Sequence, residues 1–368
     1  MVMIDNINFE LTTHAKFGAG ELENLKKYVI ELGYKKIAFV IDKNVSKTEY
    51  WKKTYKKLST LPISTILLYN SGEPTYQLLE DYRRMFYMND VIIGIGGGSV
   101  IDFAKGLAFL ATNKEPALEY RGFPKNCNKP LPVIAVPTTA GTGSEVTYNA
   151  VFVDENKKKL GINTTLNFPK LAILDPKLVQ TCPKSVMISS GLDALTHAVE
   201  SYGATKSTLI TRALSVTAMH SLLGNLRHIN SKNRTSLEVC SNLQQAAYMA
   251  GIALMNSGSG PAGAMSYILG PKFNVPHGLA GAIFLPYVVQ HNEEKGFKYP
   301  IEDLSVKLFT LYNFLNIDVS DIRKYNIKTA SDLRILAEGI ETLQPAFDQN
   351  PVPFTVEDAK DIVRKMIK

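Results

Sequence analysis

The stretch VIIGIGGGSVIDFAK, residues 91–105, decides the fold of this chain. An apolar run predicts a buried strand, glycines end it, and a helix is predicted directly after them. Glycines let a ligand approach the backbone closely, and the first N–H groups of a helix attract anionic oxygens. The stretch therefore predicts a phosphate-binding turn. The structural alternative is a tight turn in which Ser99 and Asp102 cap the helix.

The spacing of this turn differs from the common dinucleotide fingerprint. A serine, Ser99, stands where G-x-G-x-x-G requires its third glycine, and the motif does not follow the first strand of the chain. We therefore expect phosphate binding on a different chain topology. The candidate contacts are Gly96, Gly97, Gly98, Ser99 and Asp102.

Length and composition exclude several classes of protein. A chain of 368 residues exceeds one ordinary hydrophobic core, and 45% hydrophobic with 20% charged residues is typical of a globular protein. The net charge of +7 comes from scattered lysine pairs, without an aromatic-interleaved basic stripe, so we expect no nucleic-acid partner. The basic balance favours an acidic substrate.

The cysteines and the beginning of the sequence predict a cytoplasmic protein. Cys127, Cys182 and Cys240 are odd in number, far apart and without a C-x-x-C pair, which indicates reduced thiols. The start MVMIDNINFE lacks the regions of a signal peptide, and no uninterrupted apolar span is long enough for a membrane helix.

The first half of the chain alternates helical and strand-like segments. A helix is predicted over 21–32, and strands over 37–41, 65–69, 91–95 and 133–136. This order is typical of a Rossmann-like parallel α/β sheet, whose ligands bind at the carboxyl ends of the strands.

The second half changes to helical periodicity almost throughout. Helices are predicted over 190–202, 208–226, 237–255 and 302–314. We therefore expect an α/β dinucleotide-binding domain over 1–183 and an all-helical domain over 184–368, with a small-molecule site in the cleft between them.

Three residues of the second half are candidate metal ligands. Asp193 and His197 stand four residues apart on a predicted helix, so their side chains share one face and can chelate a divalent cation such as Zn or Fe. His277 lies between Pro276 and Gly278 and is the candidate third ligand. The alternatives are a simple hydrogen-bonded pair and a loop histidine at a helix start.

A second cluster of glycines and hydroxyls follows the strand at 133–136. The segment PTTAGTGSEVT, residues 137–147, offers Thr138, Thr139, Thr142 and Ser144 as donors for phosphate or ribose oxygens. Its alternative is a polar turn. Asn149 and Phe152, which come next, are candidates to line the substrate pocket.

One acidic residue bears on the choice of cofactor. Asp42 closes the strand at 37–41, where it can accept hydrogen bonds from a ribose and would repel a 2′-phosphate. We therefore expect NAD, with NADP as the alternative.

Together these residues resemble the iron-containing, group III alcohol dehydrogenase family, to which glycerol dehydrogenases and dehydroquinate synthases are more distantly similar. The resemblance covers most of the chain and rests on five blocks in order: GGGSVIDFAK at 96–105, PTTAGTGSEVT at 137–147, LAILDP at 171–176, GLDALTHAVESY at 191–202 and VPHGLAGAIFLP at 275–286.

The resemblance implies a fold and a reaction. Gly96 to Ser99 would hold the cofactor pyrophosphate, and Asp42, Thr138, Thr139 and Ser144 would contact NAD(P), with Lys159 near the ribose. The implied reaction is hydride transfer between a nicotinamide and an alcohol or carbonyl compound, with a divalent metal polarising the substrate oxygen. A homo-oligomer is also implied.

One position departs from the family pattern. The family binds its metal through an Asp, a His four residues later and two further histidines fourteen apart, the second of which matches His277. The other falls on Gly263, and a further family histidine falls on Tyr267. Asp193, His197 and His277 could still hold a metal with lower affinity. Alternatively Tyr267 or a retained histidine donates the proton without a metal. A third alternative is that the space admits a bulkier or chelating substrate, such as an acidic one assisted by Lys272, which is otherwise a surface lysine.

The sequence thus predicts an NAD(P)-dependent oxidoreductase that interconverts a small alcohol and its aldehyde or ketone, with an atypical metal site. Tyr267, His277 and Lys159 are the candidate catalytic residues. One alternative is a glycerol-dehydrogenase-like or dehydroquinate-synthase-like enzyme acting on a polyol or sugar derivative. Another is a catalytically inactive NAD-binding sensor or assembly protein.

Overall fold

The computed structural model describes residues 8–70, 72–229 and 235–367. The chain forms two compact units, and each is described by itself. The sheet unit comprises Thr12–Met187 and His228–Tyr248, and the helical unit comprises Met1–Leu11, Ile188–Arg227 and Met249–Lys368. Segment 228–248 therefore groups with the first half of the chain. No helix in the described ranges is long and apolar enough to cross a membrane.

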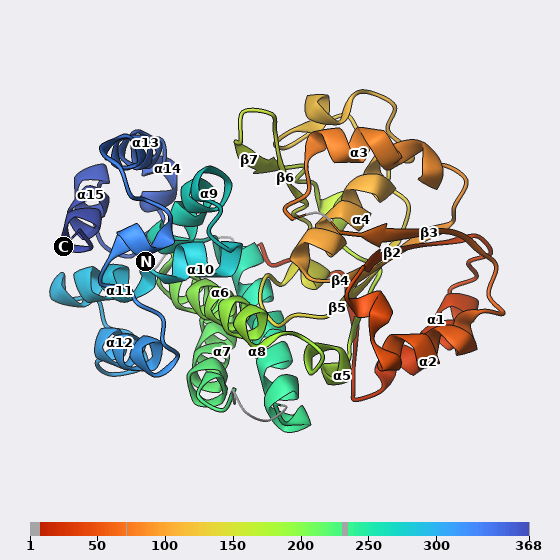
Figure 1. Ribbon diagram of the computed structural model, residues 1–368, viewed down its shortest axis with the longest axis horizontal. Coiled ribbons are helices and arrows are strands. Elements are labelled where there is room, and N and C mark those ends of the chain that lie inside the picture. Colours follow the sequence, from red (N-terminus) through yellow and green to blue (C-terminus); the bar gives the residue numbers. More distant parts are fainter. Residues whose placement is uncertain (1–7, 71, 230–234, 368) are drawn as a thin grey trace, which may run out of the picture. The chain divides into compact units, whose positions relative to one another are not determined.

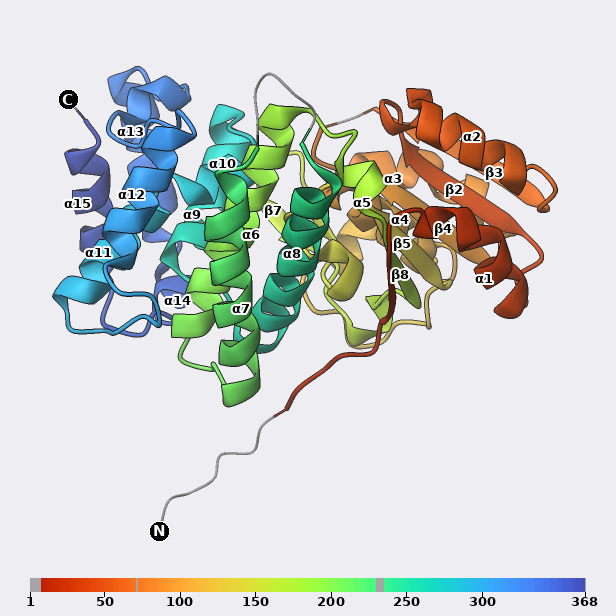
Figure 2. The ribbon, with the colours of Figure 1, turned by 90° about the horizontal axis from the view of Figure 1, so that it is seen from below.

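The sheet unit is built on six parallel strands in the order β1-β8-β5-β4-β2-β3, and Figure 2 shows β3, β2, β4, β5 and β8 in succession. The expected parallel sheet is confirmed. The strands are β1 (His14–Phe17), β2 (Ile37–Asp42), β3 (Ile63–Tyr69), β4 (Val91–Gly96), β5 (Val133–Pro137) and β8 (Leu171–Leu174). A separate antiparallel pair joins β6 (Val151–Val153) and β7 (Lys159–Gly161).

The order of the strands contains a switch point. The chain passes from β2 to β3 at one edge, and the next strand, β4, lies on the other side of β2. Ligands of open parallel sheets bind where the strand order reverses, outside the carboxyl ends. Asp42 ends β2 and Gly96 ends β4, so both candidate cofactor positions border this point.

Helices cover both faces of the sheet, because successive residues of each strand point to opposite sides. Phe39 and Ile41 of β2 face the layer of α1 (Leu25–Glu31), α2 (Glu49–Leu58) and α5 (Pro176–Val179). Ala38 and Val40 face the layer of α3 (Tyr76–Tyr82) and α4 (Gly98–Leu110). Figure 1 shows α3 and α4 on one side of the sheet and α1 and α2 on the other. Both faces are therefore buried, which explains why β4 reads as one continuous apolar run.

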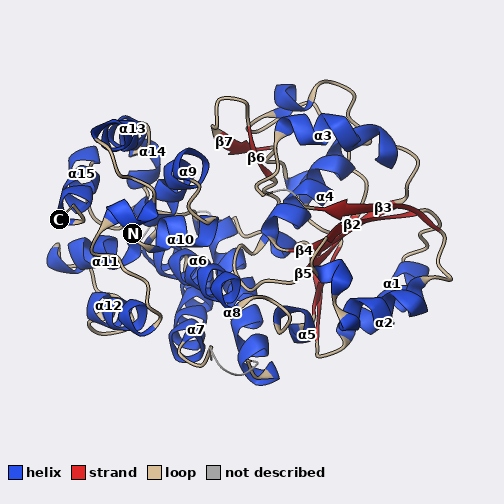
Figure 3. Cartoon of the chain, viewed as in Figure 1, coloured by secondary structure: helices blue, strands red, loops and turns tan. Residues whose placement is uncertain are grey.

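The helical unit contains no strand within the residues that the structure describes (Figure 3). The helices of the second half of the chain are α6 (Lys184–Gly203), α7 (Leu209–Leu226), α8 (Leu237–Ser257), α9 (Pro261–Phe273), α10 (His277–Ala282), α11 (Leu285–Glu294), α12 (Leu304–Phe314), α13 (Ala330–Glu341), α14 (Gln344–Phe347) and α15 (Val356–Lys365). The helices predicted from periodicity are present, several with longer ends. Short 3-10 turns occur at Glu21–Asn24, Val45–Lys47, Arg83–Phe86, Ala117–Tyr120, Ser144–Val146, Thr165–Asn167 and Ile322–Tyr325.

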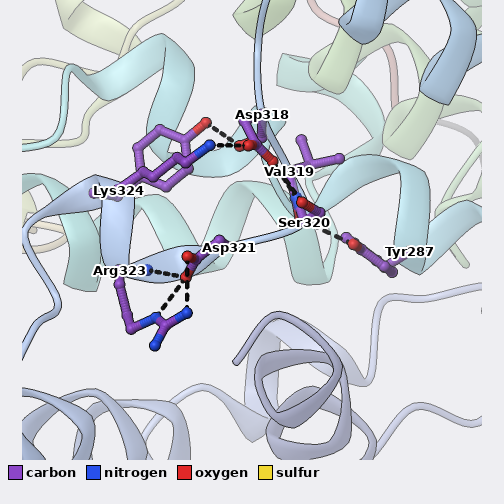
Figure 4. A network of polar contacts seen from close by, with 8 residues as sticks. Tyr287, Asp318, Val319, Ser320, Asp321, Arg323 and Lys324 are labelled. Carbon is purple, nitrogen blue, oxygen red and sulfur yellow. Dashed lines mark hydrogen bonds and ion pairs between the residues drawn. The ribbon is translucent and has the colours of Figure 1, made fainter. Parts of the chain in front are cut away.

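A polar network closes the connection after α12 (Figure 4). Asp318 accepts hydrogen bonds from Lys324 and from the backbone and hydroxyl of Ser320, and these bonds hold the pKa of its carboxyl below the usual range. Tyr287 of α11 donates to the carbonyl of Val319 at 2.9 Å. The loop is thus fixed to α11 by a hydrogen bond between Tyr287 and Val319.

A single buried carboxylate joins three parts of the sheet unit. Asp175, directly after β8, accepts hydrogen bonds from the backbone N–H groups of Gly20 at 3.0 Å and Leu22 at 3.1 Å, and from the hydroxyl of Tyr50. It also caps α5 by accepting from the N–H of Lys177 at 3.0 Å. Because the side chain is fully buried, each donor depends on this carboxylate.

We expect Asp175→Asn to lower the free energy of unfolding by about 1–3 kcal/mol, because an amide cannot accept from all four donors. Urea denaturation of the unliganded protein measures the loss. Tyr50→Phe, which removes only one of the donors, is the matched control and should cost less. An unfolding free energy of Asp175→Asn equal to that of the unsubstituted protein would contradict this assignment.

Candidate active site

In the first glycine loop, neighbouring side chains leave no room for a Cβ at two of the glycines. A Cβ at Gly96 would lie 2.4 Å from Cγ2 of Val100, and one at Gly98 would lie 2.6 Å from the side chain of Thr142. The carbonyl of Gly96 also accepts from the N–H of Thr138 at 3.0 Å. Both glycine clusters therefore meet at the carboxyl ends of the neighbouring strands β4 and β5.

The start of α4 has no side-chain cap. The N-cap residue is Gly97, and the helix shows no capping hydrogen bond from a side chain. The carboxylate of Asp102 points instead to the hydroxyl of Ser144 and to the N–H of Val151, the latter at 3.1 Å. The capping pair of Ser99 and Asp102 is therefore wrong, and the positive end of a 13-residue helix faces the loop uncapped by any side chain.

The second glycine cluster forms a compact turn beside the first. Gly143 has a φ of +66°, in the left-handed region that favours glycine, and Oγ1 of Thr142 accepts from the N–H of Ser144 at 3.2 Å. Thr138 is buried and Thr139 is half-buried. Thr139 lies near Gly97, at 3.5 Å from the place of a Cβ there. Predicted contact residues of the two clusters are thus brought together.

Two predicted cofactor contacts are already engaged with one another. The hydroxyl of Ser144 donates to Asp102 and accepts from Nζ of Lys105 at 3.0 Å. Its single proton and one acceptor position are therefore occupied within the protein. The sequence analysis did not select Lys105, although a lysine among the apolar residues of α4 was a usable signal.

Burial shifts the pKa values of the charged groups beneath the loops. It lowers the pKa of Lys105 to about 8, against the opposing fields of Asp102 and Glu145. It raises the pKa of Glu145 to about 7, and it raises that of Asp102 despite the nearby Lys105 and the hydrogen bond from Ser144. Buried titratable groups thus lie directly under the predicted phosphate site. Glu145 was also missed, although a carboxylate inside the glycine cluster could have drawn attention to it.

Two further predicted cofactor residues have partners of their own. Oδ1 of Asp42 accepts from the backbone N–H groups of Asn44 at 2.7 Å and Val45 at 3.1 Å, which fixes the carboxylate at the end of β2. Lys159 of β7 forms an ion pair with Glu73, with 2.6 Å between Nζ and Oε1. Only 7% of the lysine side chain is exposed, so Lys159 would have to contact a ribose while it is paired with Glu73.

The expectation that Phe152 lines a substrate pocket is wrong. Its ring is fully buried in the core of the sheet unit, stacks against Tyr76 with 5.5 Å between ring centroids, and fills the space above Gly106. Asn149 contributes its carbonyl to Lys105 at 2.9 Å. Alternation along β6 turns Phe152 inward, which proximity in sequence to the glycine cluster could not reveal.

In the helical unit, the structure brings Asp193 and His197 together on one face of α6. Nε2 of His197 lies 3.6 Å from Oδ1 of Asp193, and Nδ1 of His197 is buried without a hydrogen-bond partner. The turn at the start of α10 packs beside them. A Cβ at Gly278 would lie 2.3 Å from the carbonyl of Ser189 and 3.0 Å from Cβ of Asp193. His277, the first residue of α10, is half-buried.

Gly263 lies in the first turn of α9, where the carboxylate of Glu200 caps the N-terminus of the helix. The carboxylate of Glu200 accepts from the N–H groups of Gly260 at 2.9 Å, Ala262 at 2.6 Å and Gly263 at 3.0 Å, and from the hydroxyl of Ser259 at 2.9 Å. A Cβ at Gly263 would lie 2.3 Å from Oγ of Ser259 and 2.9 Å from Oε2 of Glu200. A side chain at this position therefore has no space without a rearrangement.

Tyr267 follows Gly263 by four residues on α9, with 42% of the residue exposed. The spacing places both positions on one face of the helix. The residue is thus partly exposed, as a proton donor that meets a ligand has to be.

The fold and the glycine loop define the class of protein. An open parallel sheet with an uncapped glycine-to-helix turn at its switch point is a dinucleotide-binding architecture. Residues 12–176 match the family model described as iron-containing alcohol dehydrogenase, and residues 187–311 match that of the Fe-containing alcohol dehydrogenase family, C-terminal. The chain belongs to the iron-containing alcohol dehydrogenase family, and it is an oxidoreductase of alcohols and carbonyl compounds.

Individual relatives agree with this membership. The chain is 33% identical over 291 residues to alcohol dehydrogenase 4 of Schizosaccharomyces pombe, covering 77% of this chain and 68% of the relative. It is 27% identical over 381 residues to the NAD-dependent methanol dehydrogenase of Bacillus methanolicus, covering 98% and 100%. The crystal structure of a 1,3-propanediol oxidoreductase superposes with a TM-score of 0.88 at 27% identity, covering 98% and 100%.

The family description implies a metal ion, and the side chains near Asp193 are the candidates to bind it. Asp193 and His197 provide two converging donors, and the unpartnered Nδ1 of His197 needs a hydrogen-bond partner of its own. Within the described ranges, however, no group of three His, Cys, Asp or Glu side chains could hold a metal. Catalytic zinc sites commonly use three protein ligands. The described residues therefore do not fit a complete metal centre.

We expect Gly98→Ala to destabilise the unliganded protein by about 1–3 kcal/mol, because the new methyl group would overlap Thr142 and separate the two glycine clusters. Gly97→Ala is the matched control. Its Cβ would meet Thr139 at an ordinary 3.5 Å, and its φ of −72° suits any residue. Thermal unfolding without cofactor compares the two. Equal loss in both variants would show that the contact with Thr142 does not limit this position.

We expect the purified protein to contain well below one Fe or Zn per chain, because no three His, Cys, Asp or Glu side chains of the described ranges are grouped so that they could hold a metal. Elemental analysis of the unsubstituted protein and of His277→Ala measures this. His291→Ala is the control, since that ring bonds the carbonyl of Pro353 at 3.1 Å. One metal ion per chain, lost in His277→Ala and retained in His291→Ala, would contradict the expectation and show that His277 completes the site.

Proposed function

We propose that the chain uses NAD to interconvert a small alcohol and its aldehyde or ketone by hydride transfer. The observation that carries the proposal is the uncapped start of α4 at the switch point of the sheet, where the two glycine clusters meet. A pyrophosphate placed there would receive backbone N–H groups and the positive end of the helix. The relative from Bacillus methanolicus, which matches 98% of this chain, is named as NAD-dependent, and this supports NAD as the cofactor.

The proposed cofactor contacts fall into two kinds. Gly96 to Ser99 would hold the pyrophosphate, and Thr138, Thr139 and Thr142 would supply hydroxyl groups beside it. Ser144 and Asp102 would act through the shape of the second cluster, since their polar atoms already bond one another. They would then support the cofactor without being its main donors.

Asp42 is proposed to select NAD over NADP. Its carboxylate is held at the carboxyl end of β2 by two backbone N–H groups. A ribose 2′-hydroxyl can donate to such a carboxylate, whereas a 2′-phosphate would meet like charge. NADP would therefore bind more weakly.

The proposed reaction balances as one hydride and one proton. A hydride leaves the reduced nicotinamide and bonds to the carbonyl carbon, while the electron pair of the C=O bond moves to oxygen, which then takes a proton. The proposed proton donors are Tyr267 and His277, and Lys159 would bind near the ribose. Each of these roles is a separate proposal for a named side chain.

The sequence-based assignment of Asp193, His197 and His277 as ligands of Fe or Zn is the alternative to the low metal content expected above, and the elemental analysis of His277→Ala decides between the two. The assignment requires the side chain of His277 to join the pair on α6. Since the described donors do not complete such a site, no step of the proposed reaction is assigned to a metal.

Two coarser properties accompany the proposal. We propose a homo-oligomer, which light scattering on the eluting protein would measure. We also propose action in the cytoplasm. Within the described ranges, Cys127, Cys182 and Cys240 form no disulfide, which suits a reducing compartment.

The proposal is tested by NADH and NADPH oxidation against a panel of small aldehydes and ketones. We expect a preference for NADH that falls by about tenfold in Asp42→Ser, equivalent to about 1.4 kcal/mol. Asp90→Ser is the matched control, since Asp90 also accepts two backbone N–H groups but precedes the amino end of β4.

The possible outcomes separate the alternatives. Tight NAD binding without turnover on any carbonyl or polyol would support the inactive sensor. An unchanged preference in Asp42→Ser would remove Asp42 from cofactor selection. Among Tyr267→Phe and His277→Ala, the variant that loses turnover while keeping its affinity for NADH identifies the proton donor.

A further inference from the structure

Lys105 is buried beneath both glycine clusters of the sheet unit. It lies two helical turns after Gly98 on α4, and none of its side chain is exposed. Its three donors meet three acceptors, which are Oγ of Ser144 at 3.0 Å and the carbonyls of Thr147 at 2.7 Å and Asn149 at 2.9 Å. All three acceptors lie within residues 144–149, which comprise the end of the second glycine cluster and the two residues that follow it.

Asp102 holds the same segment from the preceding turn of α4. Its carboxylate accepts from the hydroxyl of Ser144 and from the N–H of Val151 at 3.1 Å, and Oδ1 lies 4.0 Å from Nζ of Lys105. The two side chains therefore attach residues 144–151 to α4 at four points. We call this set of bonds the α4 clamp.

The clamp is connected to the surface that would receive a pyrophosphate. Residues 144–151 continue directly from the turn at Gly143, and Thr142 fills the space over Gly98. A shift of the segment would therefore move the second cluster relative to the uncapped start of α4. Since Lys105 is fully buried, it cannot touch a bound cofactor from this position and would act only through the segment.

An ammonium group is an expensive way to fill this space. Burying a charge is unfavourable unless it is paired and hydrogen-bonded, whereas an unbranched apolar side chain would carry no such cost. The hydrogen bonds of Lys105 are directional, so they define the backbone path of residues 147–149. An apolar side chain could not do this.

From this geometry we infer that Lys105 is a positioning residue for the nicotinamide cofactor, which fixes the second glycine cluster against the first from beneath. The inference rests on the proposed NAD site. It adds a residue that contacts no ligand but sets the affinity for one.

The test compares Lys105→Met with Leu107→Ala, a substitution of another fully buried residue of α4 that does not contact the segment through a side-chain hydrogen bond. The dissociation constant for NAD is measured by titration, and thermal unfolding is followed with and without saturating NAD. We expect Lys105→Met to raise the dissociation constant about tenfold or more and to shrink the NAD-induced gain in Tm. Leu107→Ala should lower Tm with an unchanged dissociation constant.

Ser144→Ala keeps the inference testable where Lys105→Met fails to fold. It removes the hydroxyl shared by Lys105 and Asp102, leaves the backbone acceptors in place, and should weaken NAD binding in the same direction with a small loss of Tm. KM for the carbonyl substrate should not change in either variant at saturating NADH.

The outcomes distinguish this inference from the proposed function. Unchanged NAD affinity in folded Lys105→Met, or an equal loss of affinity in Leu107→Ala, would overturn the positioning role alone. Failure of the unsubstituted protein to bind NAD or NADP would instead overturn the proposed function.

Discussion

The close contact between Gly98 and Thr142 is the constraint on which the site of the sheet unit depends. It is possible only because position 98 lacks a Cβ, and it places a strand-to-helix turn and a hydroxyl-rich turn side by side. The parallel sheet supplies the rest, since β4 and β5 are neighbours whose carboxyl ends lie at one edge. The same glycines therefore serve two purposes. They allow the close contact with Thr142, and they would let a ligand approach the backbone N–H groups.

Buried charge supports this arrangement from below. Asp102, Lys105 and Glu145 are unfavourable in a core, as the directions of their pKa shifts show. Hydrogen bonds to Ser144 and to backbone carbonyls offset part of that cost. The result is a loop whose path is defined by directional bonds, where apolar packing alone would leave it variable.

In the helical unit, the position that departs from the family pattern lies inside a helix cap. Glu200 gathers the N–H groups at the start of α9, and Gly263 lies within that cap. Asp193 and His197 stand one turn apart on α6, and among the described residues no group of three His, Cys, Asp or Glu side chains could hold a metal. Membership of the iron-containing alcohol dehydrogenase family thus rests on matches along the chain and not on this position.

The sequence by itself determined the parallel sheet, the helical second half and the glycine turn, because strand runs, helical periodicity and glycine spacing are local signals. It missed the short strand β1 at His14–Phe17, which has little apolar pattern, and it predicted no strand at β8 or at the pair of β6 and β7. Only the tertiary structure decided that Asp102 bonds Ser144 and not the start of its own helix, that Lys105 serves a distant segment, and that Phe152 points into the core. These outcomes depend on which residues meet across the fold, and no local spacing encodes that.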